Sequence, residues 1–557
     1  GDQVIRRLVA ILAVALVLTG CAQLPRTGAI GVGPNIELES EAEFLYYSPS
    51  APSEGDSQQQ ILSGFLSAGN GPQNDYSVAR SYLTPAFQPK WQPSDEVLVQ
   101  DGIPQFTFTD SSTAVAEIKV SATIDSQGVY QAQPEGTKRY LNFKLSQQNG
   151  EWRISSAPNL TVLIRPNFTV LFKPYQLYFF DNGHRTLVPD VRWFPSRTST
   201  ATHLVQALLV GPQSWMSPAL ARDFPAGTTL NIDSVTVVDG VATVDLSDEA
   251  FQATDEQRQF FKAQIKATLL QIPSVTSIEI SINKSPQTIP ELKANIPNAL
   301  SATPVTLDEA GIFGIGKQSM VSLTTAGLAL VQESFDFSLS PTGKGLGLLA
   351  RSGLYRISLD ALDKSPKLVY SRASLVGPQF DNLGYLWSVA SVKNSTWKVF
   401  GSTSSDRISA EALSKAPVQA FALSPDGARV AILFGGSTPG VWLHSVVRDI
   451  SGRPVEFGPG IKLDNFGLAP LSLSWVDAVN LAVLLDLDGE SARPIVQLIG
   501  GETRTYPALT GGTHFVANFS GANIFALRND GRVYQYKSNT WLEVAADVRA
   551  IHLANLR

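Results

Sequence analysis

A short turn motif recurs along the second half of the chain at nearly constant spacing, and this period restricts the possible folds more than any other feature. Ser340-Pro341-Thr342-Gly343 returns as Ser424-Pro425-Asp426-Gly427, with Asp381-Asn382-Leu383-Gly384 between them. The steps from Gly343 to Gly384 and from Gly384 to Gly427 are 41 and 43 residues. A unit of about 40–50 residues with strands on both sides of a turn is typical of a four-stranded β-propeller blade.

Two later turns continue the repeat at longer spacing. Asp477 follows Gly427 by 50 residues, and Gly531 follows Asp477 by 54. A second pair of strands is expected within each unit, for example at Gly353–Leu359 and Gly440–Val446. We therefore expect residues 300–557 to form a β-propeller of five or six blades. The Ser-Pro-Asp-Gly turn also resembles the turns of propellers of the TolB type.

The composition agrees with a multidomain, mainly β protein. Glycine (43) and proline (34) are abundant, which favours turns and strands over long helices. A length of 557 residues predicts three to four domains at roughly 150 residues each. The formal net charge is only −6 and no run of basic residues is present, so nucleic acid is not expected as a partner.

The single cysteine, Cys21, directly follows Leu18-Thr19-Gly20. Those residues end an apolar run that starts at Leu8, after Arg6 and Arg7, as in a secretory signal. The run of 11 residues is short for a spanning helix, which needs about 20. The pattern resembles the lipobox of bacterial lipoproteins. The resemblance implies a signal peptide over residues 1–20, cleavage between Gly20 and Cys21, and diacylglycerol and N-acyl groups on Cys21.

Two regions separate this signal from the repeats. Residues 21–57 are rich in Gly, Pro, Ser, Glu and Gln, and they predict a flexible tether that carries the lipid. Residues 58–160 begin with helical spacing at Ile61, Leu62, Phe65 and Leu66, followed by a short helix at Tyr76–Leu83 and several strands. This order resembles the cystatin-like and nuclear-transport-factor-like α+β folds.

Residues 165–290 predict a second α+β domain. Thr202 is expected to cap a helix that Gly211 and Pro212 end, and Asp239-Gly240 predicts a two-residue hairpin turn with positive φ at both positions. Outward from that turn, Val237 should pair with Ala242, and Val235 with Val244. Three segments resemble the GerM-type domain of sporulation and germination proteins: Leu208–Pro212, Phe224–Thr228 and Val241–Ser247. The resemblance implies a domain for interaction, without catalytic residues.

No motif predicts a catalytic, metal or cofactor site. The five histidines, His184, His203, His444, His514 and His552, are too far apart in sequence to suggest a ligand pair, and we expect packed or surface positions. Gly311–Lys317 has the glycine and lysine spacing of a P-loop, but Gln318 replaces the magnesium-binding hydroxyl and a strand-like run follows. Trp387 and Trp475 are expected in blade cores, with glycan stacking as the alternative. Two carboxylates lining the propeller channel would suffice for a glycoside hydrolase.

The order of lipobox, tether, α+β domain, GerM-like domain and propeller resembles the LpqB family of actinobacterial lipoproteins. The resemblance implies a non-enzymatic accessory protein, anchored by lipid to the outer face of the cytoplasmic membrane. Its partner would be the extracytoplasmic domain of the sensor histidine kinase MtrB of the MtrA–MtrB system, through which it would modulate cell-wall growth and division. The covalent lipid on Cys21 would be its only non-protein group. The alternative is a cell-wall glycan-binding protein or hydrolase that uses the propeller channel.

Overall fold

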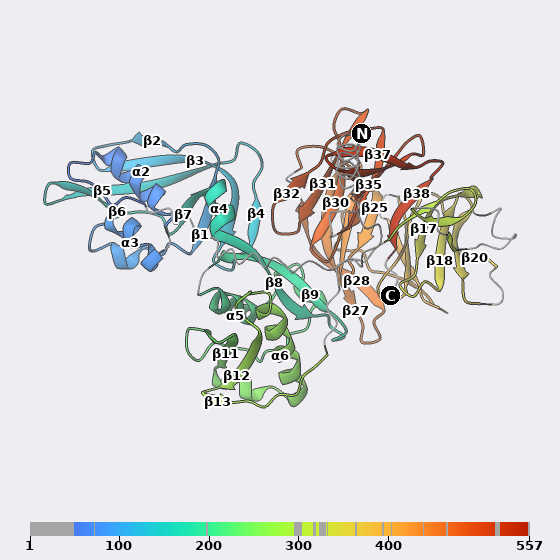
Figure 1. The fold of residues 1–557 in the computed structure, drawn as a ribbon, viewed down its shortest axis with the longest axis horizontal. Helices are drawn as coiled ribbons and strands as arrows, with labels where there is room; N and C mark the ends of the chain where they lie inside the picture. The colour runs from blue at the N-terminus through green and yellow to red at the C-terminus, as the bar shows by residue number, and fades with distance from the viewer. Residues whose placement is uncertain are drawn as a thin grey trace, which may run out of the picture. The chain divides into compact units, whose positions relative to one another are not determined.

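The structure is a computed structural model, and it describes three successive folded regions (Figure 1). The described residues are 49–554, except 72, 197–198, 294–302, 316–318, 322–329, 331, 362–364, 393–394, 403, 438, 464–465 and 519–523. The predicted signal peptide, Cys21 and most of the predicted tether lie outside the described residues.

The first region is an α+β domain, as predicted. Its first helix, α2 (Gln58–Ala68), begins with a capping box in which Ser57 and Gln60 bond to each other's backbone N–H, and it buries the four predicted apolar residues. In the next helix, α3 (Gln73–Ser81), Asn74–Tyr76 are left-handed, so the right-handed turns begin after Tyr76, close to the predicted start, and end two residues before the predicted Leu83. A sheet in the order β6-β5-β3-β1-β7 follows, in which β2 and β4 also pair with β3. Its strands are β1 (Glu96–Gln100), β2 (Gln105–Phe108), β3 (Thr113–Asp125), β4 (Tyr130–Ala132), β5 (Lys138–Gln148), β6 (Glu151–Ser156) and β7 (Thr161–Ile164), with η1 (Gln88–Lys90) before them.

The sequence-based boundaries of this domain are too narrow at both ends. The Tyr82 hydroxyl donates to the Ser50 carbonyl at 2.8 Å, and the Gly55 N–H donates to the Glu151 carboxylate at 3.0 Å. Residues 49–57 therefore contact the domain, although the sequence placed them in the tether. At the other end, β7 pairs in parallel with β1, so the sheet continues past residue 160. Helix α4 (Arg165–Leu171) then leads into the second region.

The second region combines a long hairpin with a small α+β unit. The hairpin consists of β8 (Phe172–Phe180) and β9 (Leu187–Pro195), paired over their whole length. The small unit has a sheet in the order β10-β11-β12-β13. Its elements are α5 (Thr200–Val210), η2 (Ser217–Ala219), β10 (Thr236–Val238), β11 (Val241–Leu246), η3 (Asp248–Gln252), α6 (Asp255–Leu269), β12 (Ser277–Ile282) and β13 (Ser285–Pro286).

The predicted hairpin turn is confirmed, while two details near it were wrong. Asp239 and Gly240 both have positive φ, 48° and 80°, and Val237 faces Ala242. The Thr202 hydroxyl does not cap α5, which begins at Thr200, but accepts the Val235 N–H at 2.9 Å. Because that bond uses the Val235 backbone, β10 starts one residue later and the expected Val235–Val244 pair is not formed in the ladder.

The third region is a propeller, and its described residues form six blades. The first contains β14 (Thr303–Leu307), β15 (Ile312–Gly314) and β16 (Ser319–Val321) together with the C-terminal β38 (Ala550–Ala554). The second contains β17 (Ser334–Leu339), β18 (Gly345–Ala350), β19 (Gly353–Ser358) and β20 (Lys367–Tyr370). The third contains β21 (Leu375–Phe380), β22 (Leu386–Ala390), β23 (Thr396–Phe400) and β24 (Ser405–Arg407).

The remaining three blades complete the ring. The fourth contains β25 (Val418–Leu423), β26 (Arg429–Phe434), β27 (Gly440–Arg448) and β28 (Pro454–Leu463). The fifth contains β29 (Pro470–Trp475), β30 (Asn480–Asp486), β31 (Ser491–Leu498) and β32 (Thr503–Thr505), and β33 (Leu509–Thr510) also pairs with β31. The sixth contains β34 (Gly512–Ala517), β35 (Ile524–Arg528), β36 (Val533–Lys537) and β37 (Thr540–Ala545).

The C-terminal strand closes the ring by completing the first blade. Strand β38 pairs antiparallel with β14, with His552 opposite Val305, and it contacts the neighbouring inner strands β17 and β34. The first blade therefore has no turn that joins its innermost strand to the next, and the sequence motif is missing there. The repeat assigned to Gly531 was shifted by one strand, because Gly531 lies between β35 and β36 rather than at the first turn of the sixth blade.

Closure by β38 predicts a specific effect of truncation. A chain that ends at Arg549 should lose at least about 2 kcal/mol of unfolding free energy, because the buried Ile551 and the edge pairing of β14 are both lost. A chain that ends at Ala554 keeps the whole strand and is the control. Denaturant unfolding of the two chains measures the difference. Equal stability would show that the ring does not depend on β38.

Candidate functional site

Three of the recurring turns of the propeller hold a buried aspartate, namely Asp381, Asp426 or Asp477. Asp426 accepts the Ser424 hydroxyl at 2.6 Å and the Ala428 N–H at 2.9 Å through the same oxygen. Asp477 accepts two backbone N–H groups in the same way, from Val479 and Asn480, both at 2.7 Å. An aspartate that bonds the backbone two residues on fixes a tight turn without other contacts. This local chemistry explains why the motif recurs in the sequence.

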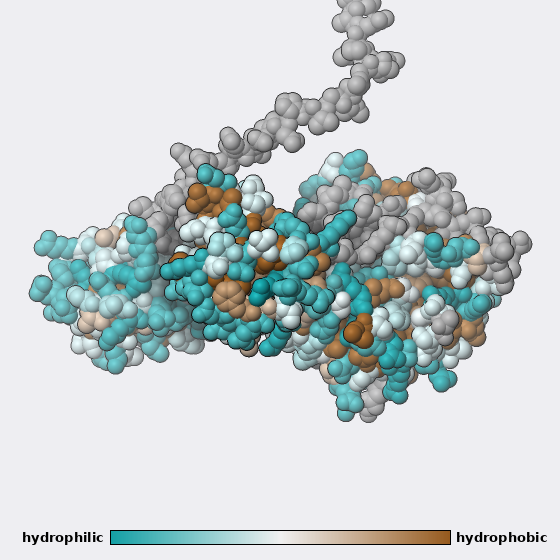
Figure 2. Space-filling view, turned by 90° about the horizontal axis from the view of Figure 1, so that it is seen from below, coloured by the Kyte–Doolittle hydropathy of each residue, from teal (hydrophilic) through white to brown (hydrophobic). Residues whose placement is uncertain are grey.

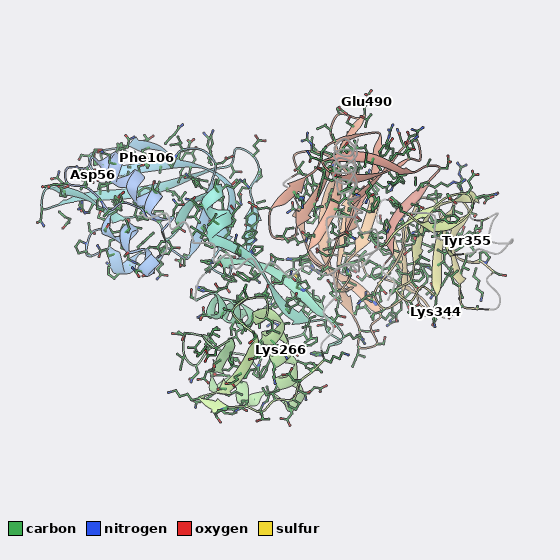
Figure 3. The ribbon with its side chains drawn as sticks, in the orientation of Figure 1. Asp56, Phe106, Lys266, Lys344, Tyr355 and Glu490 are labelled. Atoms are coloured by element: carbon green, nitrogen blue, oxygen red, sulfur yellow. The ribbon has the colours of Figure 1, made fainter. Side chains whose placement is uncertain are left out.

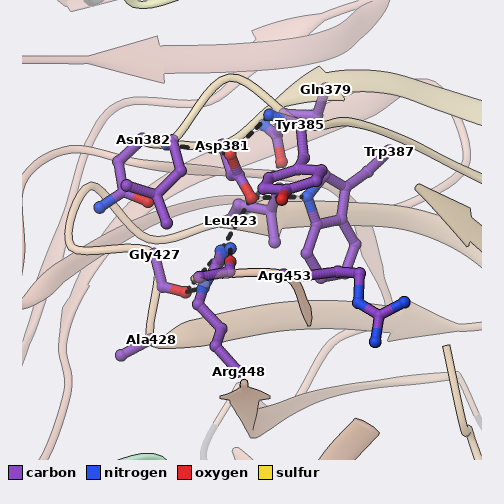
Figure 4. Close-up of polar contacts among 12 residues, drawn as sticks. Gln379, Asp381, Asn382, Tyr385, Trp387, Leu423, Gly427, Ala428, Arg448 and Arg453 are labelled. Carbon is purple, nitrogen blue, oxygen red and sulfur yellow. Dashed lines mark hydrogen bonds and ion pairs between the residues drawn. The ribbon is translucent and has the colours of Figure 1, made fainter. Parts of the chain in front are cut away.

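The second oxygen of Asp381 binds a group from another blade. Asp381 Oδ2 accepts Arg448 Nη2 at 2.8 Å and Trp387 Nε1 at 3.0 Å, and its side chain is buried (Figure 4). Arg448 also donates to the carbonyls of Gly427 and Gly452. Each charge of this buried pair is compensated by the opposite charge and by further hydrogen bonds. Because Asp381 belongs to the third blade and Arg448 to the fourth, the pair links these two blades.

The hairpin of the second region lies on the turns of the fourth and fifth blades. Buried Arg429 pairs with Asp426 and donates to two carbonyls, that of Ala478 at 2.5 Å and that of Pro189 on β9 at 3.4 Å. Trp193 Nε1, also on β9, donates to the Gly500 carbonyl at 2.8 Å. The turn that closes a blade therefore also positions the cation that holds β9.

The tip and the apolar surface of the second region add to this contact. At the tip of the hairpin, Arg185 Nη2 donates to the Ile450 carbonyl of the fourth blade at 2.6 Å. A single buried apolar cluster contains Leu177 and Leu220 of the second region together with Leu443 and Leu481 of the propeller. The two regions therefore share one core, and the burial of its apolar side chains is the main stabilising contribution to their contact.

Strand β9 also contacts the first region. Arg192 Nη1 donates to the Gln127 carbonyl at 2.9 Å, and the Trp193 N–H donates to the Gly128 carbonyl at 2.7 Å. Arg192 is buried and pairs with buried Asp190 at 2.7 Å. Trp193 thus bonds to the first region through its backbone and to the propeller through its ring. The hairpin is the element that joins all three described regions.

A cavity of about 120 Å³ opens among the inner strands of the propeller. Its wall combines apolar side chains with a few polar groups: Val305, Phe337, Ser338, Leu339, Pro341, Pro378, Gln379, Phe380, Asp381, Asn382, Leu423, Ser424, Pro425, Ser474, Trp475, Val516, His552 and Leu553. Asp381 is the one carboxylate of this described lining, and Arg448 already binds it. Trp387 and Trp475 are buried, which confirms the expectation that they belong to blade cores.

Three of the histidines have a ring nitrogen within about 3 Å of a carboxylate or carbonyl oxygen. His184 Nε2 lies 2.7 Å from the buried Asp223 carboxylate, and its ring stacks on Phe260 at 3.8 Å. His552 lies 2.6 Å from Asp336, whereas His444 is buried and bonds the Gly458 carbonyl at 3.0 Å.

His203 stacks on Phe194. His514, on β34, lies near the Asp336–His552 pair, because burial and both members of that pair affect its pKa. Within the described ranges, no group of three His, Cys, Asp or Glu side chains is placed to hold a metal ion. The P-loop-like segment Gly311–Lys317 contains β15 and is followed by strand β16 rather than by a helix, as its sequence predicted.

The expected lipid site falls outside what the structure describes. Cys21 and the Gly20–Cys21 bond precede the first described residue, so both stay predictions. Among the described helices, none combines the length and the apolar character needed to cross a membrane. The functional residues that the sequence did not indicate are the arginines, because their partners lie far away along the chain: 67 residues separate Arg448 from Asp381.

Comparisons with known proteins match all three regions. Residues 51–169 match the family described as lipoprotein LpqB, N-terminal domain, and residues 317–551 match the lipoprotein LpqB beta-propeller domain. Residues 176–288, between them, match the family described as sporulation and spore germination. These three matches follow the order of the regions in the structure.

Three similar proteins all carry the name lipoprotein LpqB. Lipoprotein LpqB of Thermobifida fusca is 26% identical over 571 aligned residues, which cover 89% of this chain and 90% of that protein. Lipoprotein LpqB of Rhodococcus jostii is 24% identical and covers 88% of this chain and 86% of its own length. Lipoprotein LpqB of Cutibacterium acnes is 30% identical over 50% of this chain and 47% of its own length.

Solved structures resemble single regions. TolB from Acinetobacter baumannii is 14% identical, with a TM-score of 0.32, and covers 46% of this chain and 67% of its own. The first GerMN domain of the sporulation protein GerM from Bacillus subtilis is 23% identical, with a TM-score of 0.19, and covers 22% of this chain and 96% of its own.

The Asp381–Arg448 pair predicts a large effect for a small substitution. Asp381→Asn keeps the shape of the side chain but leaves buried Arg448 without a compensating charge, so we expect a loss of about 3–5 kcal/mol of unfolding free energy. Asp530→Asn, in a surface pair with Arg528, is the matched control and should cost less than about 1 kcal/mol. Denaturant unfolding measures both, and equal losses would contradict the structural role of the buried pair.

The His184–Asp223 pair predicts a pH-dependent stability of the second region. The Asp223 carboxylate raises the pKa of His184, mainly by hydrogen bonding, and burial opposes that shift. A raised pKa in the folded chain means that protonation favours folding, so this contribution is complete below about pH 6.5 and is lost as the pH rises through the folded pKa. His184→Gln should remove this pH dependence in thermal unfolding, whereas the control His203→Gln should keep it. An unchanged profile in the His184 variant would refute the assignment.

Proposed function

The chain belongs to the family of the actinobacterial lipoprotein LpqB, and on this premise we propose that it is a lipid-anchored, extracytoplasmic accessory protein that modulates a sensor kinase. The proposal is supported chiefly by the hairpin β8–β9, which joins the three described regions into one unit. A rigid unit of this kind offers a partner a fixed geometry at a low entropic cost.

The proposed anchor is the lipid on Cys21. The sequence motif supports it, and the family name of the relatives is consistent with it. The anchor would place the chain on the outer face of the cytoplasmic membrane. Confinement to one membrane raises the effective concentration of two proteins for each other, so a weak interface between them is sufficient.

The proposed partner is the extracytoplasmic domain of a sensor kinase of the MtrB type, and the effect would reach cell-wall growth and division. We propose a non-enzymatic role because the charged groups at the centre of the described propeller are engaged in fixed pairs. Asp381 is bound to Arg448 and Trp387, and Asp426 is bound to Arg429 and Ser424. Carboxylate oxygens that are taken up by such partners are not placed to exchange a proton with a substrate.

The alternative role as a glycan hydrolase has less support. That chemistry needs two carboxylates that face each other across a cleft. The described lining of the propeller cavity holds one carboxylate, Asp381, and the tryptophans Trp387 and Trp475 are buried. Binding to purified peptidoglycan would distinguish a glycan-binding role, because the accessory role predicts no retention on that polymer.

Anchoring by Cys21 is tested most simply by Cys21→Ala. We expect the unanchored variant, at equal extracytoplasmic abundance, to lose regulation of the kinase, measured as phosphorylation of the response regulator in cells. A second variant, in which a transmembrane helix replaces the lipid signal, should restore regulation because it restores confinement. If the unanchored variant regulates as well as the wild-type chain, the confinement argument is wrong.

A further inference from the structure

A cavity of about 570 Å³ lies between the first region and the propeller. Ligand sites usually measure about 300–1,000 Å³ and occur preferentially where domains meet. The lining of this cavity includes Tyr130 and Ala132 of β4, Arg165 of helix α4, and Glu502 between β31 and β32 of the fifth blade. We call this cavity the β4 cleft.

Strand β4 has a free edge at this cleft. Among the described strands it pairs only with β3, in the antiparallel sense. The Gln133 N–H, just after β4, donates to the Ser121 carbonyl of β3 at 2.9 Å, which fixes the alternation of the ladder. In an antiparallel pair, every second residue bonds to the partner strand, and the residues between them direct their N–H and C=O groups to the other side. The backbone groups of Tyr130 and Ala132 therefore point away from β3.

These four backbone groups are available to a ligand. Among the described residues, neither the N–H nor the C=O group of Tyr130 or Ala132 forms a hydrogen bond. Unpaired groups along a strand edge match those of another extended chain, which can add to the sheet as a further strand. An extended polypeptide repeats one donor and one acceptor at the spacing of every second residue. The free edge is therefore suited to a peptide segment.

An ion pair joins helix α4 to the fifth blade in the wall of the cleft. Arg165 Nη1 lies 3.2 Å from the Glu502 carboxylate. Burial, and next the Glu502 carboxylate, raise the pKa of the Tyr130 phenol to about 12, which places this phenol close to the pair. Because the propeller also lines the cleft, a single extended segment fits, whereas the folded sheet edge of a second copy would collide with the fifth blade.

The uncompensated charges of the cleft are negative. Asp101 and Glu135 line it, and neither forms an ion pair in the part of the chain that the structure describes. The cation Lys119 already has a carboxylate nearby, since the pKa of Glu117 is lowered mainly by the hydrogen bond from Lys138 and also by Lys119. A lysine or arginine of a bound segment would compensate Asp101 and Glu135. Such exposed charges select a partner more than they add affinity.

The visible surface does not favour an apolar mode of binding. The face shown in Figure 2 is mostly hydrophilic, and its hydrophobic patches are separate. In Figure 3, the labels Phe106 on β2 and Glu490 before β31 identify the first region and the fifth blade, both of which line the β4 cleft. Main-chain hydrogen bonding is thus the recognition chemistry that this cleft offers.

We propose that the β4 cleft binds an extended segment of another protein, with a lysine or arginine in it, and that the segment adds to β4 as a further strand. The backbone of Tyr130 and Ala132 supplies the hydrogen bonds, and Asp101 and Glu135 select the charge. A bound segment contacts the first region and the propeller at once, so its binding stabilises their arrangement. The inference adds a binding site to the proposed accessory role and does not depend on the identity of the partner.

The test uses the chain from residue 21 onward with Cys21→Ser, so that no lipid is attached. The probe is a displayed library of random linear peptides, and the affinities of selected peptides are measured by fluorescence anisotropy. We expect these peptides to contain lysine or arginine. They should bind the Ala132→Pro variant at least about tenfold more weakly, because proline removes a donor from the free edge. The β3 ladder should persist, since the Ala132 N–H is not part of it.

Two further variants separate backbone recognition from charge. Ala132→Ser keeps the N–H and is the matched control, which should bind like the wild-type chain, and thermal unfolding of both Ala132 variants checks the fold. The double variant with Asp101→Asn and Glu135→Gln should lose the preference for basic peptides and the sensitivity of binding to salt. If Ala132→Pro binds every selected peptide as well as Ala132→Ser does, or if the double variant keeps the preference, the inference is wrong.

Amide hydrogen exchange tests the same claim without a substitution in the cleft. A bound peptide should slow the exchange of the Tyr130 and Ala132 amides, which have no partner among the described residues of the free chain. Unchanged exchange at both amides, with the peptide at saturation, would overturn the proposal. Because the library is random and no lipid is present, these results are independent of the proposed kinase partner and of the Cys21→Ala test.

Discussion

The described architecture depends on the contact between the β8–β9 hairpin and the propeller. The hydrogen bond from buried Arg429 to the Pro189 carbonyl is part of that contact. The same arginine is held by Asp426, whose other oxygen closes the first turn of the fourth blade. A carboxylate that makes a turn therefore also fixes the cation that attaches a second domain. Removing one partner of such a buried pair costs far more than a surface pair contributes, so turn and contact are coupled.

The hairpin carries this constraint further along the chain. Trp193 is bonded to Gly128 of the first region through its backbone and to Gly500 of the propeller through its ring. Arg192, one residue away, bonds to Gln127 and pairs with Asp190. One strand thus replaces the flexible linkers that commonly separate domains. For a protein proposed to act by binding at a membrane, a fixed arrangement of surfaces is the relevant property.

The sequence predicts features that depend on neighbouring residues and misses those that depend on distant ones. The Asp239-Gly240 turn, the α2 face at Ile61 and Phe65, and the propeller repeat follow from local chemistry and period. Closure of the ring by β38 does not, because β14 and β38 are separated by most of the propeller. Cys21 is the opposite case, a site predicted by local sequence that lies outside the described residues.

The central claim is that β9 is an internal strand of one unit made from three regions. Amide hydrogen exchange of Leu187–Pro195 in the full chain tests it directly, because buried strands exchange only through opening of the structure around them. The account predicts protection of these amides comparable to that of the inner propeller strand β25 (Val418–Leu423). Exchange of β9 at the rate of an exposed loop, with β25 still protected, would contradict the account.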